Sequence, residues 1–321
     1  MIESIHNFIE KHLLIENYNT IIVGFSGGPD SLFLLHCLAQ MRAAKNLTLI
    51  AAHLDHEWRE NSHDEAVFCH TIAESLEIPF VAARMSELYF DKKSSGSQEE
   101  LGRRARRFFL ESVLAEHNAD AIALAHHLND QEETFLIRLI RGATIAGLAS
   151  MKPHDGRYIR PLLEIQKKDI IAYLEKNGID YITDPTNTSE SYLRSRIRTH
   201  VIPALRYCDD RFDANFQKTL QHIQEADSFL DIVTEDVFTQ TATLQENIWY
   251  LSLATFLMLH PFLQQRILIH WLIISKVSFV PSQRFLNEIM RFLQQPGSKE
   301  HTIHTTWSII KKKNIAHIKH I

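Results

Sequence analysis

The chain has 321 residues, of which 45% are apolar and 23% are charged. This composition is typical of a folded globular protein and excludes a disordered tail protein, a collagen and a disulfide scaffold. Lys and Arg together number 34 and Asp and Glu number 39, so the net charge is −5. A general attraction to nucleic acids or anionic membranes is therefore excluded, and any such binding requires a local basic patch.

Length, cysteine usage and apolar runs narrow the class further. The length suits two domains. The three cysteines include no C-x-x-C pair, which argues against a redox dithiol, a zinc knuckle and an iron–sulfur cluster. This cysteine usage is typical of a protein in a reducing cytoplasm. The first residues lack the basic start of a signal peptide, and no apolar run approaches the ~20 residues that cross a bilayer. We therefore expect a cytoplasmic protein with no membrane partner.

Short apolar runs alternate with helical patterns over the first 200 residues. Runs that are apolar on both faces, each followed by a helical pattern, predict a doubly wound α/β domain with a parallel sheet. An amphipathic helix over residues 2–13 precedes the first strand. The predicted strands are 20–25, 47–54, 78–84, 119–125 and a short fifth at 158–162, and the predicted helices include 31–41, 62–76 and 130–141.

The pattern changes after about residue 210. Apolar residues then recur at three- and four-residue steps, which predicts one long helix from Phe212 to Val237. Pro261 and Pro281 each stand where a further helix can begin. The Ile- and Thr-rich segments 302–310 and 314–321 predict a small hairpin. We therefore expect an α/β domain over 1–210 and a mostly helical domain over 211–321.

The most informative segment is the turn between the first strand and its helix, with the sequence Ser-Gly-Gly-Pro-Asp-Ser. Glycines without Cβ atoms allow phosphate oxygens to approach the main-chain N–H groups, and the start of a helix adds partial positive charge. The serines supply hydroxyl groups, and Asp30 can hold a magnesium ion against the phosphates. These features predict a polyphosphate site formed by Ser26, Gly27, Gly28, Pro29, Asp30 and Ser31.

Three other interpretations of this turn stay open at the level of residues. The G-x-S-x-G spacing at 24–28 fits the nucleophile elbow of α/β-hydrolases, although few residues precede it for the strands and oxyanion loop which that elbow needs. A Walker loop requires a Lys after the glycines, and none is present. The third interpretation is a Gly-rich turn that binds nothing.

Two carboxylates follow the fourth predicted strand. Asp130 and Glu133 are three residues apart at the start of a helix, so both lie on one face at the sheet edge that also carries the turn. They can bind ammonium groups, or they can simply stabilise the positive end of their helix. His127 is a candidate contact for nucleotide or phosphate. The spacing of His126 and Asp130, and of His53 with its neighbours, leaves a zinc site as an alternative.

Arginines cluster twice in this acidic chain. Guanidinium groups form bidentate hydrogen bonds with phosphate, so both clusters are candidate RNA contacts. A solvated helix face paired to nearby glutamates is the alternative for the first cluster. The first cluster is Arg103, Arg104, Arg106 and Arg107, and the second is Arg194, Arg196 and Arg198.

The turn at 26–31 resembles the pyrophosphatase loop of the N-type ATP pyrophosphatases, which split ATP into AMP and pyrophosphate while adenylating a substrate. Further segments are similar to the signatures of the tRNA(Ile)-lysidine synthetases within that superfamily. These segments are 99–107, 125–148, 160–163 and 184–198, so the resemblance covers about residues 20–205. The second domain looks, more loosely, like the family's first carboxy-terminal domain.

The resemblance implies an ATP- and magnesium-dependent ligation of free lysine to C2 of the wobble cytidine of an isoleucine tRNA with a CAU anticodon. A tRNA thiolase of the same fold and a non-catalytic ATP-binding sensor are the alternatives, and a homodimer is left open. The family assignment implies that Asp130, Glu133, His127, Arg194 and Arg196 contact lysine or the reacting groups, and that Arg103, Arg104, Arg106, Arg107 and Arg198 contact tRNA.

The chain departs from the family pattern at a few positions outside the loop. Ser195 stands where Asn is usual, and Asn129 stands where Asp is usual. Glu57 and Trp58 replace Gly-Leu, and Gly102 replaces Ala. The changes at Glu57, Trp58 and Gly102 lie near His56, where the resemblance implies contacts to the adenosine of ATP.

Overall fold

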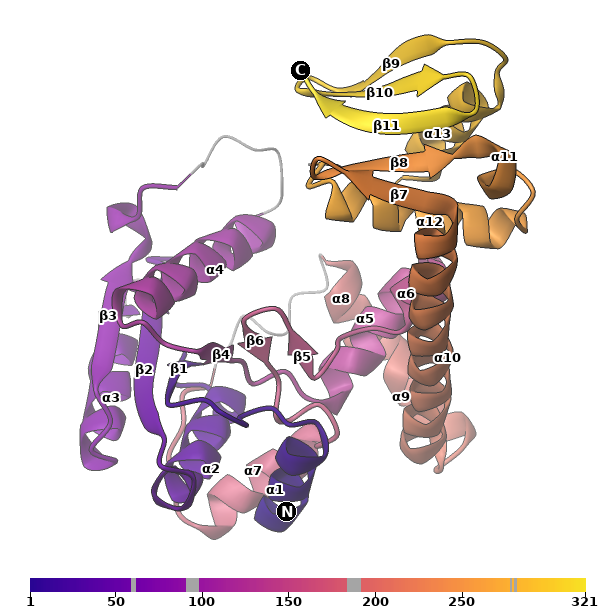
Figure 1. The fold of residues 1–321 in the computed structure, drawn as a ribbon. Coiled ribbons are helices and arrows are strands. Elements are labelled where there is room, and N and C mark those ends of the chain that lie inside the picture. Colours follow the sequence, from indigo (N-terminus) through magenta and orange to yellow (C-terminus); the bar gives the residue numbers. More distant parts are fainter. Residues whose placement is uncertain (59–61, 91–97, 184–191, 278, 280–281) are drawn as a thin grey trace. The chain divides into compact units, whose positions relative to one another are not determined.

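The computed structural model describes residues 1–58, 62–90, 98–183, 192–277, 279 and 282–321, and the chain divides into two compact units, 1–221 and 222–321 (Figure 1). The division lies inside the long helix α10, Phe212–Thr241. The predicted helix start at Pro281 and the segment 184–187 lie outside the described residues.

The first unit contains a six-stranded sheet in the order β3-β2-β1-β4-β6-β5, in which β5 is the antiparallel member. In the central strand β1, Ile21 and Val23 pack into one core cluster and Ile22 into another, because successive side chains point to opposite faces. The strands are β1 Thr20–Gly24, β2 Thr48–Asp55, β3 Phe80–Arg84, β4 Ala121–Ala123, β5 His154–Asp155 and β6 Tyr158–Ile159.

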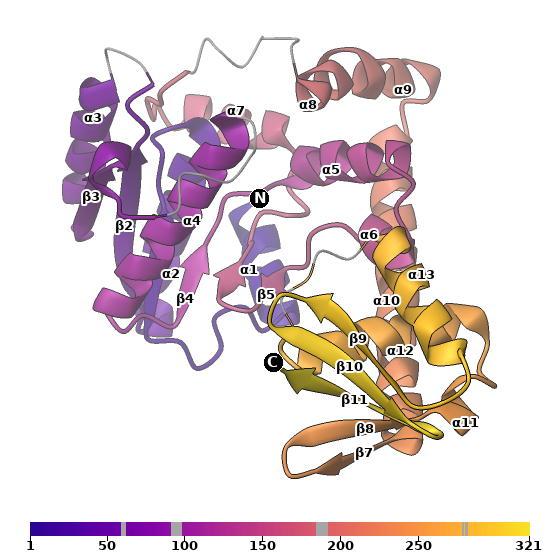
Figure 2. The same cartoon turned by 90° about the horizontal axis from the view of Figure 1, so that it is seen from above.

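Helices cover both faces of this sheet (Figure 2). Residues of α1, α2, α3 and α7 share the core cluster of Ile21, while α4 packs into the cluster of Ile22. The helices of the unit are α1 Ile2–Lys11, α2 Pro29–Lys45, α3 Ser62–Ser75, α4 Gln98–Glu116, α5 Leu128–Ile140, α6 Ile145–Leu148, α7 Lys167–Lys176, α8 Leu193–Arg196 and α9 Ile202–Cys208, with a short 3₁₀ turn η1 at Met85–Glu87 and a π-helical turn η3 at Ile197–Val201.

The expected doubly wound α/β fold is confirmed. Strands β1 to β4 lie within a few residues of their predicted bounds: β1, β2 and β4 are mostly buried apolar runs, while β3 is a partly exposed strand at the edge of the sheet. Strand β5 was not predicted, since its two exposed polar residues carry no hydrophobic pattern. The parallel pairing places the carboxyl ends of β1, β2 and β4 at one edge of the sheet.

The second unit combines helices with a five-stranded antiparallel sheet in the order β7-β8-β11-β10-β9. Helix α12 begins at Pro261, as the sequence predicts, and packs with the strands in one core. The elements after α10 are β7 Ala242–Gln245, β8 Ile248–Ser252, α11 Leu253–Phe256, α12 Pro261–Ile274, α13 Gln283–Gln294, β9 Lys299–His304, β10 Trp307–Lys312 and β11 Ile315–His320.

This sheet is larger than the small hairpin expected from the sequence. The predicted strand 302–310 is split by a turn between β9 and β10, and β7 with β8 forms a further hairpin that was not predicted. Three of the four residues of β7 are exposed, so they lack the apolar alternation that marks a strand. The unit is therefore a mixed helix-and-sheet body.

Lys311 shows how the sheet and α13 are joined within the second unit. Its side chain is buried, and Nζ donates to the carbonyl oxygens of Phe292 at 3.1 Å and Leu293 at 3.3 Å and to that of Gln295. A cation here satisfies carbonyl groups at the end of a helix. Lys311 is thus a structural residue. Among the described helices, none combines the length and apolar character that a bilayer span needs.

Candidate functional site

The turn after β1 is held in one conformation by its own side chains. Ser31 Oγ accepts from the backbone N–H of Ser26 at 3.2 Å and donates to the carbonyl oxygen of Gly28 at 3.0 Å. Gly27 has φ of +76°, and a Cβ there would lie 2.5 Å from Cδ1 of Ile182. Within the described chain, no hydrogen bond uses the N–H groups of Gly27 and Gly28. The two glycines therefore present main-chain donors beside the start of α2, as a phosphate site requires.

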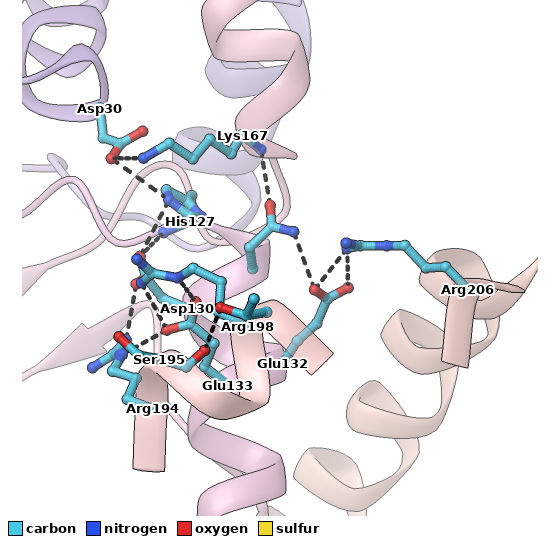
Figure 3. Close-up of polar contacts among 12 residues, drawn as sticks. Asp30, His127, Asp130, Glu132, Glu133, Lys167, Arg194, Ser195, Arg198 and Arg206 are labelled. Atoms are coloured by element: carbon cyan, nitrogen blue, oxygen red, sulfur yellow. Dashed lines mark hydrogen bonds and ion pairs between the residues drawn. The ribbon is translucent and has the colours of Figure 1, made fainter. Parts of the chain in front are cut away.

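Asp30, in the first turn of α2, is the charged residue of this turn. Its Oδ2 lies 3.0 Å from Lys167 Nζ and 3.6 Å from His127 Nε2, while Oδ1 is buried without a hydrogen-bond partner (Figure 3). Burial opposes ionisation, but the hydrogen bond and charge of His127, together with Lys167, outweigh it and lower the pKa of Asp30. An ionised carboxylate with one unused oxygen fits a magnesium ion, which prefers one or two carboxylates together with substrate phosphates.

The structure favours this arrangement over a fixed zinc site. Among the described residues, no group of three His, Cys, Asp or Glu side chains is arranged to hold a metal ion. His53, one of the residues with suggestive spacing, instead contacts the carbonyl oxygen of Phe25 through Nδ1 at 3.0 Å. Its ring therefore has a structural role at the base of the turn.

The acidic pair of α5 is occupied by two arginines. Arg194 donates through Nε to Glu133 at 2.5 Å and through Nη2 to Asp130 at 2.9 Å. Arg198 donates through Nε and Nη2 to Glu133, at 2.5 and 3.1 Å. Glu133 is only 2% exposed, and a buried carboxylate is costly unless a cation pairs with it. Any ammonium group that binds here must compete with a guanidinium group.

The two arginines meet the same carboxylate because the segment is helical. Residues four apart lie on one face of a helix, which brings Arg194 and Arg198 together and leaves the exposed Arg196 on another face. The sequence places the three arginines at alternate positions, and their division between two faces follows only from the helix. Arg194, which was expected to contact lysine or the reacting groups, lies at the acidic pair. Arg198, which was expected to contact tRNA, lies there as well.

His127 connects the turn to the acidic pair. Nε2 lies 3.6 Å from both Asp30 and Asp130, and the backbone N–H of His127 donates to Asp130 Oδ2 at 3.0 Å. Burial would lower the pKa of His127, but the two carboxylates outweigh it and raise that pKa. Burial dominates at the neighbouring His126, where it lowers the pKa to about 4 with the help of Arg160. The two adjacent histidines therefore favour opposite charge states.

The arginines of α4 have partners within the protein to different extents. Arg107 donates to Glu111 at 2.9 Å and lies over the ring of Tyr158. Arg106 Nη2 is 3.3 Å from His56 Nε2. Arg103 is exposed. The cluster thus lies on one helix, as expected, but its members differ in their freedom to meet an RNA.

Two departures from the family pattern explain each other. The rings of Trp58 and His56 stack with centroids 4.6 Å apart, and a Cβ on Gly102 would lie 2.4 Å from Cη2 of Trp58. The indole therefore occupies the space beside position 102, and a larger residue there would require the half-exposed ring of Trp58 to shift. The pair forms an aromatic surface at the carboxyl end of β2, next to the strand that carries the turn.

Several residues of the site were not anticipated from the sequence. Lys167, which pairs with Asp30, begins a helix that was not predicted and is 137 positions away along the chain. Glu132, between the two carboxylates considered above, is fully buried and accepts from Arg206 Nη2 at 2.8 Å. Asn129 joins Glu132 to the start of α7. Nothing in the local sequence marks these long-range pairings.

Comparison with known proteins agrees with this geometry. A family model described as a PP-loop domain matches residues 1–205. Proteins named tRNA(Ile)-lysidine synthase are similar to the chain: 32% identity with that of Bacillus anthracis, covering 92% of this chain and 64% of the relative, and 35% with that of Bacillus subtilis, covering 76% and 53%. The protein of this name from Geobacillus kaustophilus is 34% identical, over 84% of this chain and 59% of its own length. The chain thus spans about half to two thirds of these relatives.

A solved structure shares the fold. The U34-tRNA thiolase NcsA of Methanococcus maripaludis, described with its 4Fe–4S cluster, superposes with a TM-score of 0.58 at 20% identity, over 70% of this chain and 78% of that one. At this identity the likeness supports the fold alone.

Proposed function

The chain belongs to the PP-loop family, and we propose that it is an ATP-dependent ligase that modifies tRNA. In the proposed reaction, the C2 oxygen of the wobble cytidine in an isoleucine tRNA with a CAU anticodon attacks the α-phosphate of ATP, and pyrophosphate leaves. The amine of free lysine then displaces AMP at C2, which gives lysidine. The proposal rests above all on one observation: Asp30 of the loop and the pair Asp130 and Glu133 belong to one cluster, joined through His127 and Arg194.

The first half of the reaction is assigned to the loop after β1. The glycine N–H groups and the start of α2 would bind the phosphates of the leaving pyrophosphate, and Asp30 would hold a magnesium ion through its unpartnered Oδ1. The ion supplies positive charge at the phosphates. Lys167, 3.0 Å from Asp30 and 43% exposed, adds a second cation that can turn toward a phosphate. These groups stabilise the charge that develops when pyrophosphate leaves.

The second half is assigned to the acidic pair. A lysine ammonium can take the place of one guanidinium group on Glu133 without changing the net charge of the cluster. The displaced arginine then becomes available for an anion, either the lysine carboxylate or a phosphate. Asp130, bonded to His127 and Arg194, connects this site to the loop. A lysine held on Glu133 would therefore lie in the same cluster of side chains as the phosphate-binding loop.

The tRNA would be recognised by exposed guanidinium groups. Arg103 on α4 and Arg196 on α8 are exposed and lie on the two helices with arginine clusters. Arg104, Arg106 and Arg107 would add to the α4 surface, each first giving up contacts within the protein; those of Arg106 and Arg107 are to His56 and Glu111. Because the whole chain is acidic, this local surface must carry the salt-dependent part of binding.

A thiolase activity has weaker support from the cysteines. Sulfur chemistry needs an accessible thiolate. Cys37 and Cys69 are buried, and burial raises the pKa of both thiols, that of Cys69 to about 12. Cys208 is the exposed cysteine. The chain shares its fold with a thiolase. That fold is common to the superfamily, so it does not favour sulfur transfer over lysine transfer.

The decisive experiment is incubation of the chain with labelled lysine, ATP, magnesium and an isoleucine tRNA transcript with a CAU anticodon. We expect label to enter the tRNA, with one AMP and one pyrophosphate released per lysine. The matched control is the same transcript with uridine at the wobble position, which should accept no lysine. Pyrophosphate release without lysine transfer would favour another adenylating activity, and ATP binding without pyrophosphate release would favour a sensor.

A further inference from the structure

A buried ionic group lies beside the acidic pair and takes no part in the reaction proposed above. Glu132 is 0% exposed, and its Oε2 accepts from Arg206 Nη2 at 2.8 Å and from Asn129 Nδ2 at 3.1 Å (Figure 3). Arg206 also donates through Nε to Asp213 at 2.7 Å. A fully buried carboxylate is costly unless it is paired and hydrogen-bonded. Its presence one position from Glu133 therefore calls for a function.

Asn129 links this ionic group to helix α7. While its amide nitrogen donates to Glu132, its Oδ1 accepts from the backbone N–H of Lys167 at 2.9 Å. Lys167 is the first residue of α7, and the residue before it, Gln166, supplies no side-chain cap to the helix. Asn129 thus caps α7 from a neighbouring helix, and the first N–H groups of a helix need such a partner.

The side chain of the capped residue reaches the loop. Lys167 Nζ lies 3.0 Å from Asp30 Oδ2. The chain of contacts runs from Arg206 through Glu132, Asn129 and Lys167 to Asp30. These contacts join four elements, α9, α5, α7 and α2, with both Glu132 and Asn129 on α5.

We propose that Asn129 and Glu132 are positioning residues for ATP: they fix the first turn of α7 so that Lys167 holds its ammonium group at Asp30 beside the phosphate-binding loop. Glu132, held by Arg206, orients the amide of Asn129. The oriented amide then sets the position of Lys167. The inference deepens the proposed function and rests on its ATP-binding step.

The network requires an amide at position 129. An amide donates to Glu132 and accepts from Lys167 at the same time, whereas a carboxylate can only accept. Aspartate, the residue usual in the family, would place two carboxylates about 3.1 Å apart here. Asn129 and Glu132 form one donor–acceptor pair, and this pairing explains why asparagine replaces the usual aspartate here.

The test is the affinity of the full chain for ATP with magnesium, measured by titration calorimetry without tRNA or lysine. At about pH 8, above the pKa of Glu132, which burial raises to about 7, Asn129→Asp should weaken binding about tenfold, because a hydrogen bond to a charged group is replaced by repulsion. The double variant Asn129→Asp/Glu132→Gln should return to within about twofold of the wild type, because the glutamine amide now donates to the new carboxylate. Asn177→Asp is the matched control, since Asn177 bonds to Tyr173 O at the opposite end of α7. It should leave ATP binding unchanged.

A double-mutant cycle with Lys167→Met separates positioning from general stability. If Asn129 acts through Lys167, then Asn129→Asp in the Lys167→Met background should change ATP affinity by less than about twofold. A tenfold loss in that background would overturn the inference, as would wild-type affinity in Asn129→Asp or no recovery in the double variant. Thermal unfolding of each variant confirms that it is folded. The test measures ATP binding and not lysine transfer. Its result therefore holds even if the proposed ligase reaction fails.

Discussion

Gly27 offers a substitution whose cost can be worked out from the structure. Its φ is +76°, a region that residues with a Cβ adopt at a cost. A Cβ would also lie 2.5 Å from Ile182 Cδ1 and 3.0 Å from Cys69 Sγ. Gly178 is the matched control, because its φ is +61° and nothing lies within 4 Å of an added Cβ.

The two glycines separate conformational strain from overpacking. Gly178→Ala should cost about 1 kcal/mol, the price of the left-handed conformation alone. Gly27→Ala adds overpacking of about 1–3 kcal/mol, so its total cost should be about 3 kcal/mol. For a unit of 221 residues, 1 kcal/mol lowers the unfolding midpoint by about 3 °C. We therefore expect midpoints lower by about 3 °C for Gly178→Ala and about 9 °C for Gly27→Ala.

The assay is differential scanning calorimetry, with ATP titration as a second measurement. Ile182→Val removes the Cδ1 atom that lies 2.5 Å from the added Cβ, so Gly27→Ala should cost about 1 kcal/mol less in that background. Gly27→Ala should also weaken ATP binding, whereas Gly178→Ala should not. Equal midpoints for the two glycine variants, or no relief from Ile182→Val, would refute the assignment of Gly27 as a tightly packed phosphate-loop residue.

Three further predictions follow from the site. Asp30→Ala should abolish pyrophosphate release but leave tRNA affinity nearly unchanged, because the tRNA surface is assigned elsewhere; equal loss of both would count against the site. His127 has a raised pKa, so its ion pairs stabilise the fold fully below its unfolded pKa of about 6.5. That stability disappears as the pH rises through the folded pKa, and the unfolding midpoint of the wild type should fall more above pH 7 than that of His127→Asn; parallel pH profiles would contradict the assignment. Charge reversal at Arg103 and Arg107 should weaken tRNA binding and reduce its salt dependence by about one to two charges, and an unchanged slope in filter binding would remove α4 from the RNA surface.

The residues around the loop could be predicted because their arrangement is local. An apolar run, two glycines, a proline and an acid within a dozen residues predict a strand, a turn and a helix start, and β1 and α2 follow this prediction. The position of Asp130 and Glu133 near that turn follows from parallel topology, since strands of one parallel sheet end at the same edge.

The pairings across the site could not be predicted, because tertiary packing selects them. Arg194 and Glu133 are 61 positions apart, and Lys167 and Asp30 are 137 apart. The sequence contains many other arginines and lysines that satisfy the same chemistry. Strands β5 and β7 were missed for a different reason: their exposed residues carry too little apolar pattern. Strand β8, in contrast, is rich in apolar and aromatic residues, so a strand was predictable there.

The arginines on Glu133 imply that lysine binding is an exchange of cations. Glu133 is buried, and its two guanidinium partners already neutralise it, so lysine gains little by displacing one of them unless that arginine finds a new anion. ATP supplies such an anion at the neighbouring loop. We therefore expect lysine to bind about tenfold more tightly when a non-hydrolysable ATP analogue is present, and the analogue to bind more tightly by the same factor with lysine. Titration calorimetry with each ligand in turn measures both factors.

Arg194→Gln should strengthen lysine binding without nucleotide and reduce the coupling, because the competing cation is gone. Identical lysine affinity with and without the analogue would mean that the arginines are fixed parts of the protein core, and that lysine binds elsewhere.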